Sequence, residues 1–408
     1  MSLSARPGIA LVVPLLEGGG GVPAVADFIA TAIERSQRFR LKLVSLAMAS
    51  NDPVSLRLAA PGTWLAGVRH SGGTWRGREF VHVGASLTEF EWRRYQGRDA
   101  LRKVVGDCDL IQVVCGSPAW GLSVSGLGRP LAIQCATRAA VERRVRDGNG
   151  RGLKAAWRRF MTRITDRMDD RALRVADAVQ VENPWMFDYA RQLNGGRDAL
   201  IRYAPPGVDA QRFAPLPVRD LATDPCILCV ARLDDPRKRV ELLLEAYALL
   251  PAQVRGRVRL VLAGAAGPGE AFWRRAQALG VQDRVSYTGP LDEAALIACY
   301  RGASVFALAS DEEGLGVVLL EAMACGVPAV STRSGGPDGI ISDGVDGYLV
   351  PLDDAGAMAR RLGQLLEDEG LNLGMGAAAR QTIMRRYESE VAGQAFLDIY
   401  DELLARKR

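Results

Sequence analysis

Short apolar runs alternate with amphipathic stretches along almost the whole chain, and this alternation restricts the fold more than any other feature. Runs such as Leu41–Leu46 and Val258–Ala263 have the length and apolar character of buried strands, while Val240–Leu250 has helical periodicity. Strands that alternate with helices form parallel sheets with helices on both faces. The sequence therefore predicts an α/β protein built on parallel sheets.

The strand–helix pattern runs once through the first half of the chain and restarts near Pro225. The segment before the restart, residues 203–225, is rich in Pro, Gly and Asp and has no period, which is typical of a linker. The chain has 408 residues, too many for one hydrophobic core. We therefore predict two doubly wound Rossmann-like domains that face each other across a cleft, with ligands at the carboxyl ends of the strands.

Apolar runs and cysteines restrict the location of the protein. No apolar run approaches the ~18–20 residues that span a bilayer, and Ile9–Leu16 resembles a buried first strand more than a signal peptide. The seven cysteines are odd in number and mostly lie in apolar stretches, which is typical of reduced thiols in a cytoplasmic protein. The C-x-x-C of Cys226 and Cys229 lies in a strand-like run, so we expect core packing there and no metal.

The strongest chemical signal is a glycine-rich segment between two glutamates. Glu313 precedes Gly314, Leu315 and Gly316, and Glu321 follows the next apolar run. Glycines where a helix begins let backbone N–H groups approach a ligand, and a helix N-terminus favours phosphate. A carboxylate after an apolar run needs a partner, such as a sugar or ribose hydroxyl. The alternative is a nonspecific strand–loop–helix with solvated glutamates.

A second signal is a pair of cations after the strand near Cys229. Arg232 ends that strand, and Lys238 lies where the next helix is expected to start. Two fixed cations at the end of a strand suit a diphosphate, which Arg can bind with two hydrogen bonds. Arg237 and Arg239 flank Lys238 and leave the choice of cation open, and a solvated helix start is the alternative.

These motifs resemble the family 4 retaining glycosyltransferases, which have the GT-B architecture. The signature of that family is two glutamates separated by seven residues, and Glu313 and Glu321 match it. Further matching segments, in the order of the family, are Pro205–Phe213, Val285–Tyr300, Ala322–Gly326, Gly335–Gly336 and Asp343–Gly347. The resemblance covers most of Pro205–Val350.

The resemblance implies roles for these residues. Glu313 would face the transferred sugar, and Arg232 and Lys238 would be directed at the donor phosphates, so these three are the predicted catalytic residues. The other predicted donor-binding residues are Gly289, Pro290 and Leu291 beside the nucleobase, Gly314, Leu315 and Gly316 at the sugar, and Glu321 on the ribose.

The implied reaction transfers a sugar from a UDP-sugar or GDP-sugar to an acceptor hydroxyl with retention of configuration. We expect no metal and no cofactor besides this cosubstrate, because the sequence has no convincing D-x-D in a strand-end loop. Asp234–Asp235 and Asp353–Asp354 are typical turn or capping residues. Two alternatives stay open: a GT-B hydrolase or epimerase of nucleotide sugars, and a non-catalytic nucleotide-sugar-binding protein.

The N-terminal half resembles the family weakly. Gly19, Gly20 and Gly21 are predicted to approach the donor diphosphate, the alternative being a flexible turn. The family carries a His near the transferred sugar, but the matching stretch Pro130–Arg144 has none. Thr137, Arg138 and Glu142 are the candidates for the acceptor side in its place, whereas His70 and His82 are more typical of surface or core residues.

The resemblance also implies the roles of the two domains. We predict an acceptor-binding domain over 1–205, joined by a crossover helix at 388–408, and a donor-binding domain over 206–387. The region Arg138–Arg174 carries twelve Lys or Arg and five Asp or Glu. Its helix Leu153–Met168 is basic and amphipathic with Trp and Phe, which is typical either of a membrane surface or of an ordinary core-facing helix.

The basic helix and the predicted donor site indicate which partners the protein binds. We expect peripheral membrane contact through 151–168 at the inner face of the membrane, or guidance of an anionic, lipid-linked acceptor. Nucleic-acid binding is not expected, because aromatic platforms and a recognisable module are missing. The sequence does not indicate an oligomeric state.

Overall fold

The computed structural model describes residues 6–14, 16, 20–148, 152–197, 199–218 and 223–406. The chain divides into two compact units, Met1–Pro206 with Ala392–Arg408, and Gly207–Val391. This division falls beside the expected domain boundary, and the last helix returns to the first unit.

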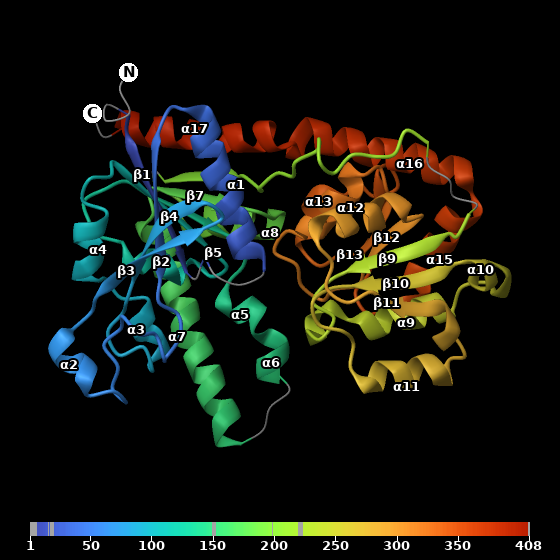
Figure 1. The fold of residues 1–408 in the computed structure, drawn as a ribbon, viewed down its shortest axis with the longest axis horizontal. Helices are drawn as coiled ribbons and strands as arrows, with labels where there is room; N and C mark the ends of the chain where they lie inside the picture. The colour runs from blue at the N-terminus through green and yellow to red at the C-terminus, as the bar shows by residue number, and fades with distance from the viewer. Residues whose placement is uncertain are drawn as a thin grey trace. The chain divides into compact units, whose positions relative to one another are not determined.

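The first unit is built on an eight-stranded sheet within the described residues, in the order β3-β4-β2-β1-β5-β6-β7-β8 (Figure 1). Its strands are β1 (Gly8–Pro14), β2 (Arg40–Leu46), β3 (His70–Trp75), β4 (Arg78–Val83), β5 (Leu110–Cys115), β6 (Leu131–Cys135), β7 (Ala178–Val181) and β8 (Leu200–Tyr203). Every neighbouring pair is parallel except β3 and β4. These two form a hairpin whose turn residues, Arg76 and Gly77, both have positive φ, which is the geometry that a two-residue hairpin turn requires.

Helices cover both faces of this sheet. They are α1 (Gly21–Ser36), α2 (Gly62–Ala66), α3 (Glu91–Arg94), α4 (Asp99–Val104), η2 (Pro118–Ser123), α5 (Ala139–Glu142), α6 (Arg144–Gly148), α7 (Leu153–Val175), α8 (Pro184–Leu193) and α17 (Ser389–Arg406). Alternate residues of β1 face opposite ways. Leu11 belongs to a core cluster with residues of α1 and α17, and Val12 to a cluster with residues of η2, α7 and α8.

The second unit contains a six-stranded sheet within the described residues, in the order β11-β10-β9-β12-β13-β14, with every pair parallel. Its strands are β9 (Cys226–Val230), β10 (Arg259–Ala263), β11 (Val285–Tyr287), β12 (Val305–Leu308), β13 (Ala329–Thr332) and β14 (Gly347–Val350). Its helices are η3 (Pro236–Lys238), α9 (Val240–Ala248), α10 (Ala252–Arg257), α11 (Glu270–Ala278), η4 (Gln282–Arg284), α12 (Glu293–Gly302), α13 (Val317–Ala324), α14 (Gly336–Ile340), α15 (Ala355–Glu367), α16 (Glu369–Thr382) and η5 (Ile383–Tyr387). Two core clusters, one on each face, make this unit doubly wound as predicted.

The cysteines are core residues. All seven are free, and all except Cys299 are buried. Cys226 and Cys229 belong to different core clusters on opposite faces of β9, so their side chains cannot share a ligand. Among the described residues, no helix is both long and apolar enough to cross a membrane.

The packing of α17 predicts how mutations in this helix affect stability. Phe396 and Tyr400 are fully buried, and each packs edge-to-face on an aromatic ring, Phe28 and Phe39 respectively. Phe396→Ala should lower the free energy of unfolding by about 3–5 kcal/mol because it leaves a cavity. Tyr400→Phe should be neutral or stabilising by about 1 kcal/mol, because the Tyr400 hydroxyl has no hydrogen-bond partner within the described residues. Urea unfolding of the full chain measures both, and a clear loss of stability in Tyr400→Phe would contradict the second expectation.

Candidate functional site

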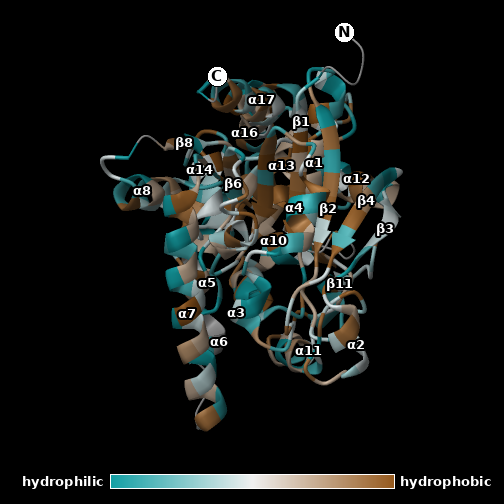
Figure 2. Ribbon diagram, turned by 90° about the vertical axis from the view of Figure 1, so that its left-hand side faces the viewer, coloured by the Kyte–Doolittle hydropathy of each residue, from teal (hydrophilic) through white to brown (hydrophobic). Residues whose placement is uncertain are grey.

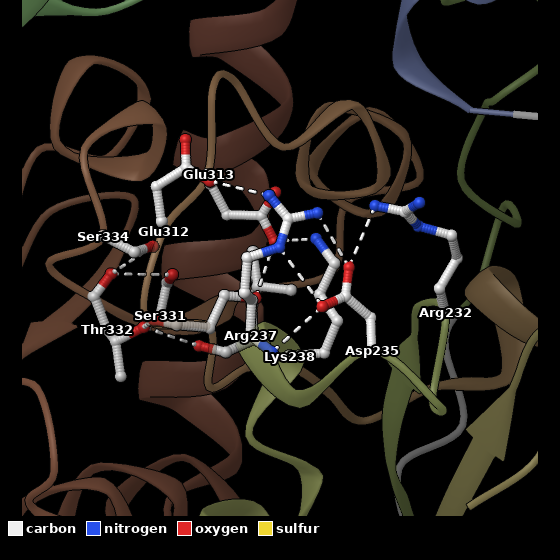
Figure 3. Close-up of polar contacts among 11 residues, drawn as sticks. Arg232, Asp235, Arg237, Lys238, Glu312, Glu313, Ser331, Thr332 and Ser334 are labelled. Carbon is white, nitrogen blue, oxygen red and sulfur yellow. Dashed lines mark hydrogen bonds and ion pairs between the residues drawn. The ribbon is translucent and has the colours of Figure 1, made fainter. Parts of the chain in front are cut away.

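A buried ion pair lies at the carboxyl end of β12. Glu313, in the loop that follows this strand, is only 8% exposed. Its Oε1 accepts a hydrogen bond from Lys238 Nζ at 2.6 Å (Figure 3). It accepts a second one from Ser310 Oγ at 2.6 Å. Two charges taken out of water together require such direct pairing. The pair therefore joins the loop after β12 to the segment after β9, as expected for neighbouring parallel strands.

Backbone contacts with the segment after β13 hold the Glu313 loop in place. Glu313 N donates to Ser334 O, and Gly336 N donates to Glu313 O, each at 2.9 Å. A Cβ atom on Gly336 would lie 2.3 Å from Leu315 O. Only glycine permits this approach, which gives the Gly335–Gly336 match a structural reason.

A second cluster of charges lies beside the ion pair (Figure 3). Asp235 Oδ2 contacts Arg232 at 3.1 Å and Arg237 at 2.8 Å, and Arg237 also contacts Glu312 at 3.1 Å. Burial alone would raise the pKa of Asp235, but the hydrogen bonds from Arg237 and the charges of Arg237 and Arg232 together lower the pKa. Asp235 is therefore an anion that holds two guanidinium groups, and the Arg232 side chain remains 60% exposed.

The neighbouring cations Arg237, Lys238 and Arg239 are directed at different acids. Arg237 contacts Asp235 and Glu312, whereas Arg239 contacts Asp353 and, at 3.5 Å, Asp311. Lys238 alone of the three contacts Glu313 among the described residues. The position expected for Lys238 needs correction, because Lys238 closes the short turn η3, and the helix α9 begins at Val240.

Glu321 lies on α13, apart from these clusters. This helix starts directly after Gly316, whose φ of 90° favours glycine. The partner that the sequence required for Glu321 is Tyr300 on α12, whose hydroxyl donates to Glu321 Oε2 at 2.7 Å. Burial raises the pKa of Glu321 to about 7, although the hydrogen bond from Tyr300 opposes this shift.

The predicted nucleobase segment lies at the carboxyl end of β11. Gly289 has a φ of 78°, and its carbonyl accepts a hydrogen bond from Gly264 N at 3.4 Å. Leu291 is partly buried against one of the core clusters. Because all strands of this sheet are parallel, Gly289–Leu291 share one edge of the sheet with Arg232 and Glu313.

The predicted residues of the first unit are more scattered. Gly20 caps α1 with a φ of 129°, and Gly21 is the first residue of that helix, whereas Gly19 lies outside the described residues. Arg138 contacts Asp166 and Asp170 of α7, each at 2.8 Å, and its guanidinium lies 4.0 Å from the centre of the Tyr189 ring. These contacts tie the start of α5 to α7.

The other two acceptor-side candidates lie on the same segment. Thr137 is only 5% exposed, and its hydroxyl has no partner within the described residues. Glu142 is half-buried at the end of α5.

Asp169 of α7 is a buried carboxyl that no sequence motif marked. It accepts hydrogen bonds from Ser117 Oγ, from Ala119 N and from Ala139 N, so it holds the segments that follow β5 and β6. Burial raises its pKa to about 6 despite these bonds. An acid among the basic residues of an amphipathic helix was the only available signal.

The histidines have ordinary surroundings. His82 on β4 lies 2.6 Å from Asp52 and 3.1 Å from Ser45, and His70 is exposed on β3. Within the described ranges, no group of three or more His, Cys, Asp and Glu side chains could hold a metal ion.

The raised pKa of Glu321 predicts a pH-dependent stability. The folded state binds a proton here between the ordinary pKa of 4.5 and about 7, so the free energy of unfolding should fall as pH rises through this window. Glu321→Gln keeps an acceptor for Tyr300 and removes the titration. The variant should therefore gain stability relative to the original chain as pH rises, in urea unfolding at pH ~5 and ~8. An equal pH dependence of the two proteins would contradict the assignment.

Comparison with known proteins agrees with the family resemblance of the sequence motifs. A family model described as Glycosyl transferases group 1 matches residues 218–382. The GDP-mannose-dependent alpha-(1-6)-phosphatidylinositol monomannoside mannosyltransferase of Mycolicibacterium smegmatis is 34% identical over 220 residues, which are 50% of this chain and 57% of that protein. The D-inositol 3-phosphate glycosyltransferase of Xylanimonas cellulosilytica is 36% identical over 225 residues, 51% of this chain and 52% of that one.

Structural similarity extends over both units. The structure of Anabaena HepE in complex with UDP aligns with 97% of this chain and 100% of that chain, with a TM-score of 0.71 at 18% identity. The predicted fold class, GT-B, is therefore confirmed. The chain spans about half the length of the curated relatives it matches. The family model lies within the second unit and covers the Glu313 loop and the cation that contacts it, so the similarity to the glycosyl transferases group 1 family lies in residues 218–382.

Proposed function

We propose that this protein is a retaining glycosyltransferase that moves a sugar from a nucleoside diphosphate sugar to an acceptor hydroxyl without a metal. The observation that carries this proposal is the buried Lys238–Glu313 pair, with the exposed Arg232 held nearby by Asp235. The Glu321 match and the collinear motifs of a group 1 domain support it.

The proposed chemistry needs positive charge where the donor breaks. As the glycosidic bond breaks, negative charge grows on the departing diphosphate. Arg232 and Lys238, with the backbone amides at Gly314–Gly316, would stabilise this charge, and each such preorganised group typically contributes ~10²–10³-fold. Cations of this kind take the place of a divalent metal.

Glu313 would orient the sugar and balance the charge of Lys238. Its Oε1 already accepts two hydrogen bonds, a position that suits an orienting group better than a nucleophile. The resemblance implies attack on the face from which the leaving group departs, with the departing phosphate taking the proton of the acceptor hydroxyl. In this proposal Glu321 binds the ribose and Gly289–Leu291 lie beside the base.

The donor would be a UDP-sugar or a GDP-sugar, and the acceptor a sugar or a lipid-linked sugar. One relative named above depends on GDP-mannose and acts on a phosphatidylinositol monomannoside, and HepE was solved with UDP. The acceptor would bind the first unit near Thr137, Arg138 and Glu142.

Residues 151–168 would contact the inner face of a membrane from the cytoplasm. The basic α7 and the free cysteines support this location.

The proposal predicts a large kinetic effect at Lys238. Lys238→Ala should lower turnover at least ~100-fold, because it removes a cation that stabilises the leaving phosphate. Arg239→Ala is a matched control, because it removes the neighbouring cation, Arg239, which contacts Asp353 and Asp311 instead of Glu313. Product formation from radiolabelled donor measures both variants, and circular dichroism verifies the fold. Comparable turnover in the two variants would refute the role of Lys238.

The donor base is open to a direct binding measurement. A thermal-shift panel with UDP, GDP and ADP should show stabilisation by one nucleotide, about 2.7 kcal/mol at a ligand concentration of 100 Kd. Arg232→Ala should weaken this effect. Binding with no transfer to any acceptor would favour a non-catalytic role, and consumption of donor in water alone would favour a hydrolase.

A further inference from the structure

A small apolar pocket lies between α3 and α7 of the first unit. Its volume is about 460 Å³, within the range of ~300–1,000 Å³ that is typical of ligand pockets. Most of its wall is made of the apolar side chains Trp92, Trp157, Phe160, Ile164 and Met168. Gln96 and Arg171 complete the wall. The sequence gives Ile164 and Met168 the helical spacing of a core face, yet in the structure both border this open space.

An exposed apolar stripe on α7 leads into the pocket. Leu153 is 92% exposed, Trp157 53% and Phe160 49%, and the rings of Trp157 and Phe160 lie 5.8 Å apart. The first turns of α7 extend beyond the sheet of this unit (Figure 1), and brown apolar bands alternate with teal polar bands along them (Figure 2). Large apolar side chains gathered on one surface mark a binding surface.

A second exposed apolar element lies at the same end of the unit. Trp64 on α2 is 53% exposed and Leu65 is 101% exposed. The segment before α2 contacts the segment before α3, because Ala59 N donates to Glu89, and the ring of the next residue, Phe90, lies 5.0 Å from that of Trp92 on the pocket wall. Both views place α2, α3 and the start of α7 at the end opposite α17 (Figures 1 and 2).

Charge on α7 indicates which partner fits this surface. The helix carries seven basic and three acidic side chains. Its acids face the rest of the unit, because Asp166 and Asp170 contact Arg138 and Asp169 is buried. Lys154, Arg159 and Arg163 are exposed beside the apolar stripe. An apolar stripe flanked by cations is complementary to an anionic bilayer, where each basic residue contributes about 1 kcal/mol.

We propose that the α3–α7 pocket binds one acyl chain of an anionic membrane phospholipid. The chain enters along the stripe of Leu153, Trp157 and Phe160 and ends against Trp92, Ile164 and Met168, while Lys154, beside the entry, faces the phosphate of the head group. This inference rests on the membrane contact of residues 151–168 in the proposed function. It adds a defined lipid site and extends the contact to α2 and α3.

Tryptophan quenching tests the pocket directly. The full chain is mixed with phosphatidylcholine vesicles that contain phosphatidylglycerol with brominated acyl chains, because bromine quenches tryptophan on contact. We expect the vesicles to quench emission, and Trp92→Phe to lose part of this quenching. Trp273→Phe is the matched control, since Trp273 packs against the core of the second unit, and its loss should leave the quenched component unchanged.

Vesicle cosedimentation separates the apolar from the charged contribution. Phe160→Asp should lower partitioning about tenfold on anionic vesicles. Arg163→Gln should lower it about fivefold on anionic vesicles and leave it unchanged on neutral ones. Nucleotide thermal shifts of the same variants should stay unchanged, so a failed lipid site is distinguishable from a failed donor site.

Three outcomes would overturn the proposal. The first is an absence of vesicle binding. The second is binding with equal quenching in Trp92→Phe and the original chain. The third is a dimer in sedimentation without lipid that Phe160→Asp dissociates, because a second copy of the chain would then cover the stripe.

Discussion

The candidate site of the second unit is organised around one ion pair, Lys238 with Glu313. Lys238 and Glu313 come from loops after neighbouring strands, and their pairing compensates the two charges for a partial loss of contact with water. The pair therefore fixes the distance between the two loops. Arg232 is more exposed than Arg237, Lys238 or Arg239, and it is held by Asp235 and not by the pair itself.

Backbone contacts around the pair explain the glycines of the motif. The loop of Glu313 pairs with Gly335, and Gly336 lies so close to Leu315 that a side chain has no room. The conformation of Gly316 then allows α13 to start directly after the loop. Charge pairing, close backbone approach and a helix start thus occur within one short segment, a combination suited to a phosphate-bearing ligand.

The first unit uses buried polar groups differently. Asp169 holds the segments after β5 and β6 with three hydrogen bonds, and Arg138 ties the start of α5 to α7. The positions proposed for the acceptor therefore rest on α7. The same helix carries the apolar stripe, so a single element supports the segments near the proposed acceptor side and the proposed lipid site.

The sequence alone determined the parallel α/β architecture, and it predicted a division of the chain close to that of the two compact units. Apolar periodicity and glycine spacing are local properties, and the order of strands and helices follows from them. The hairpin of β3 and β4 escaped prediction because the residues of β3, such as Gly72 and Thr74, are mostly exposed and carry no apolar alternation.

Only the tertiary structure decided which charges meet. Arg237, Lys238 and Arg239 are consecutive and chemically alike, and the turn of η3 directs each to a different carboxylate. Likewise, Glu321 meets Tyr300 because α12 and α13 pack together. A side chain's partner depends on contacts between segments far apart in the chain, and periodicity within one segment carries no information about them.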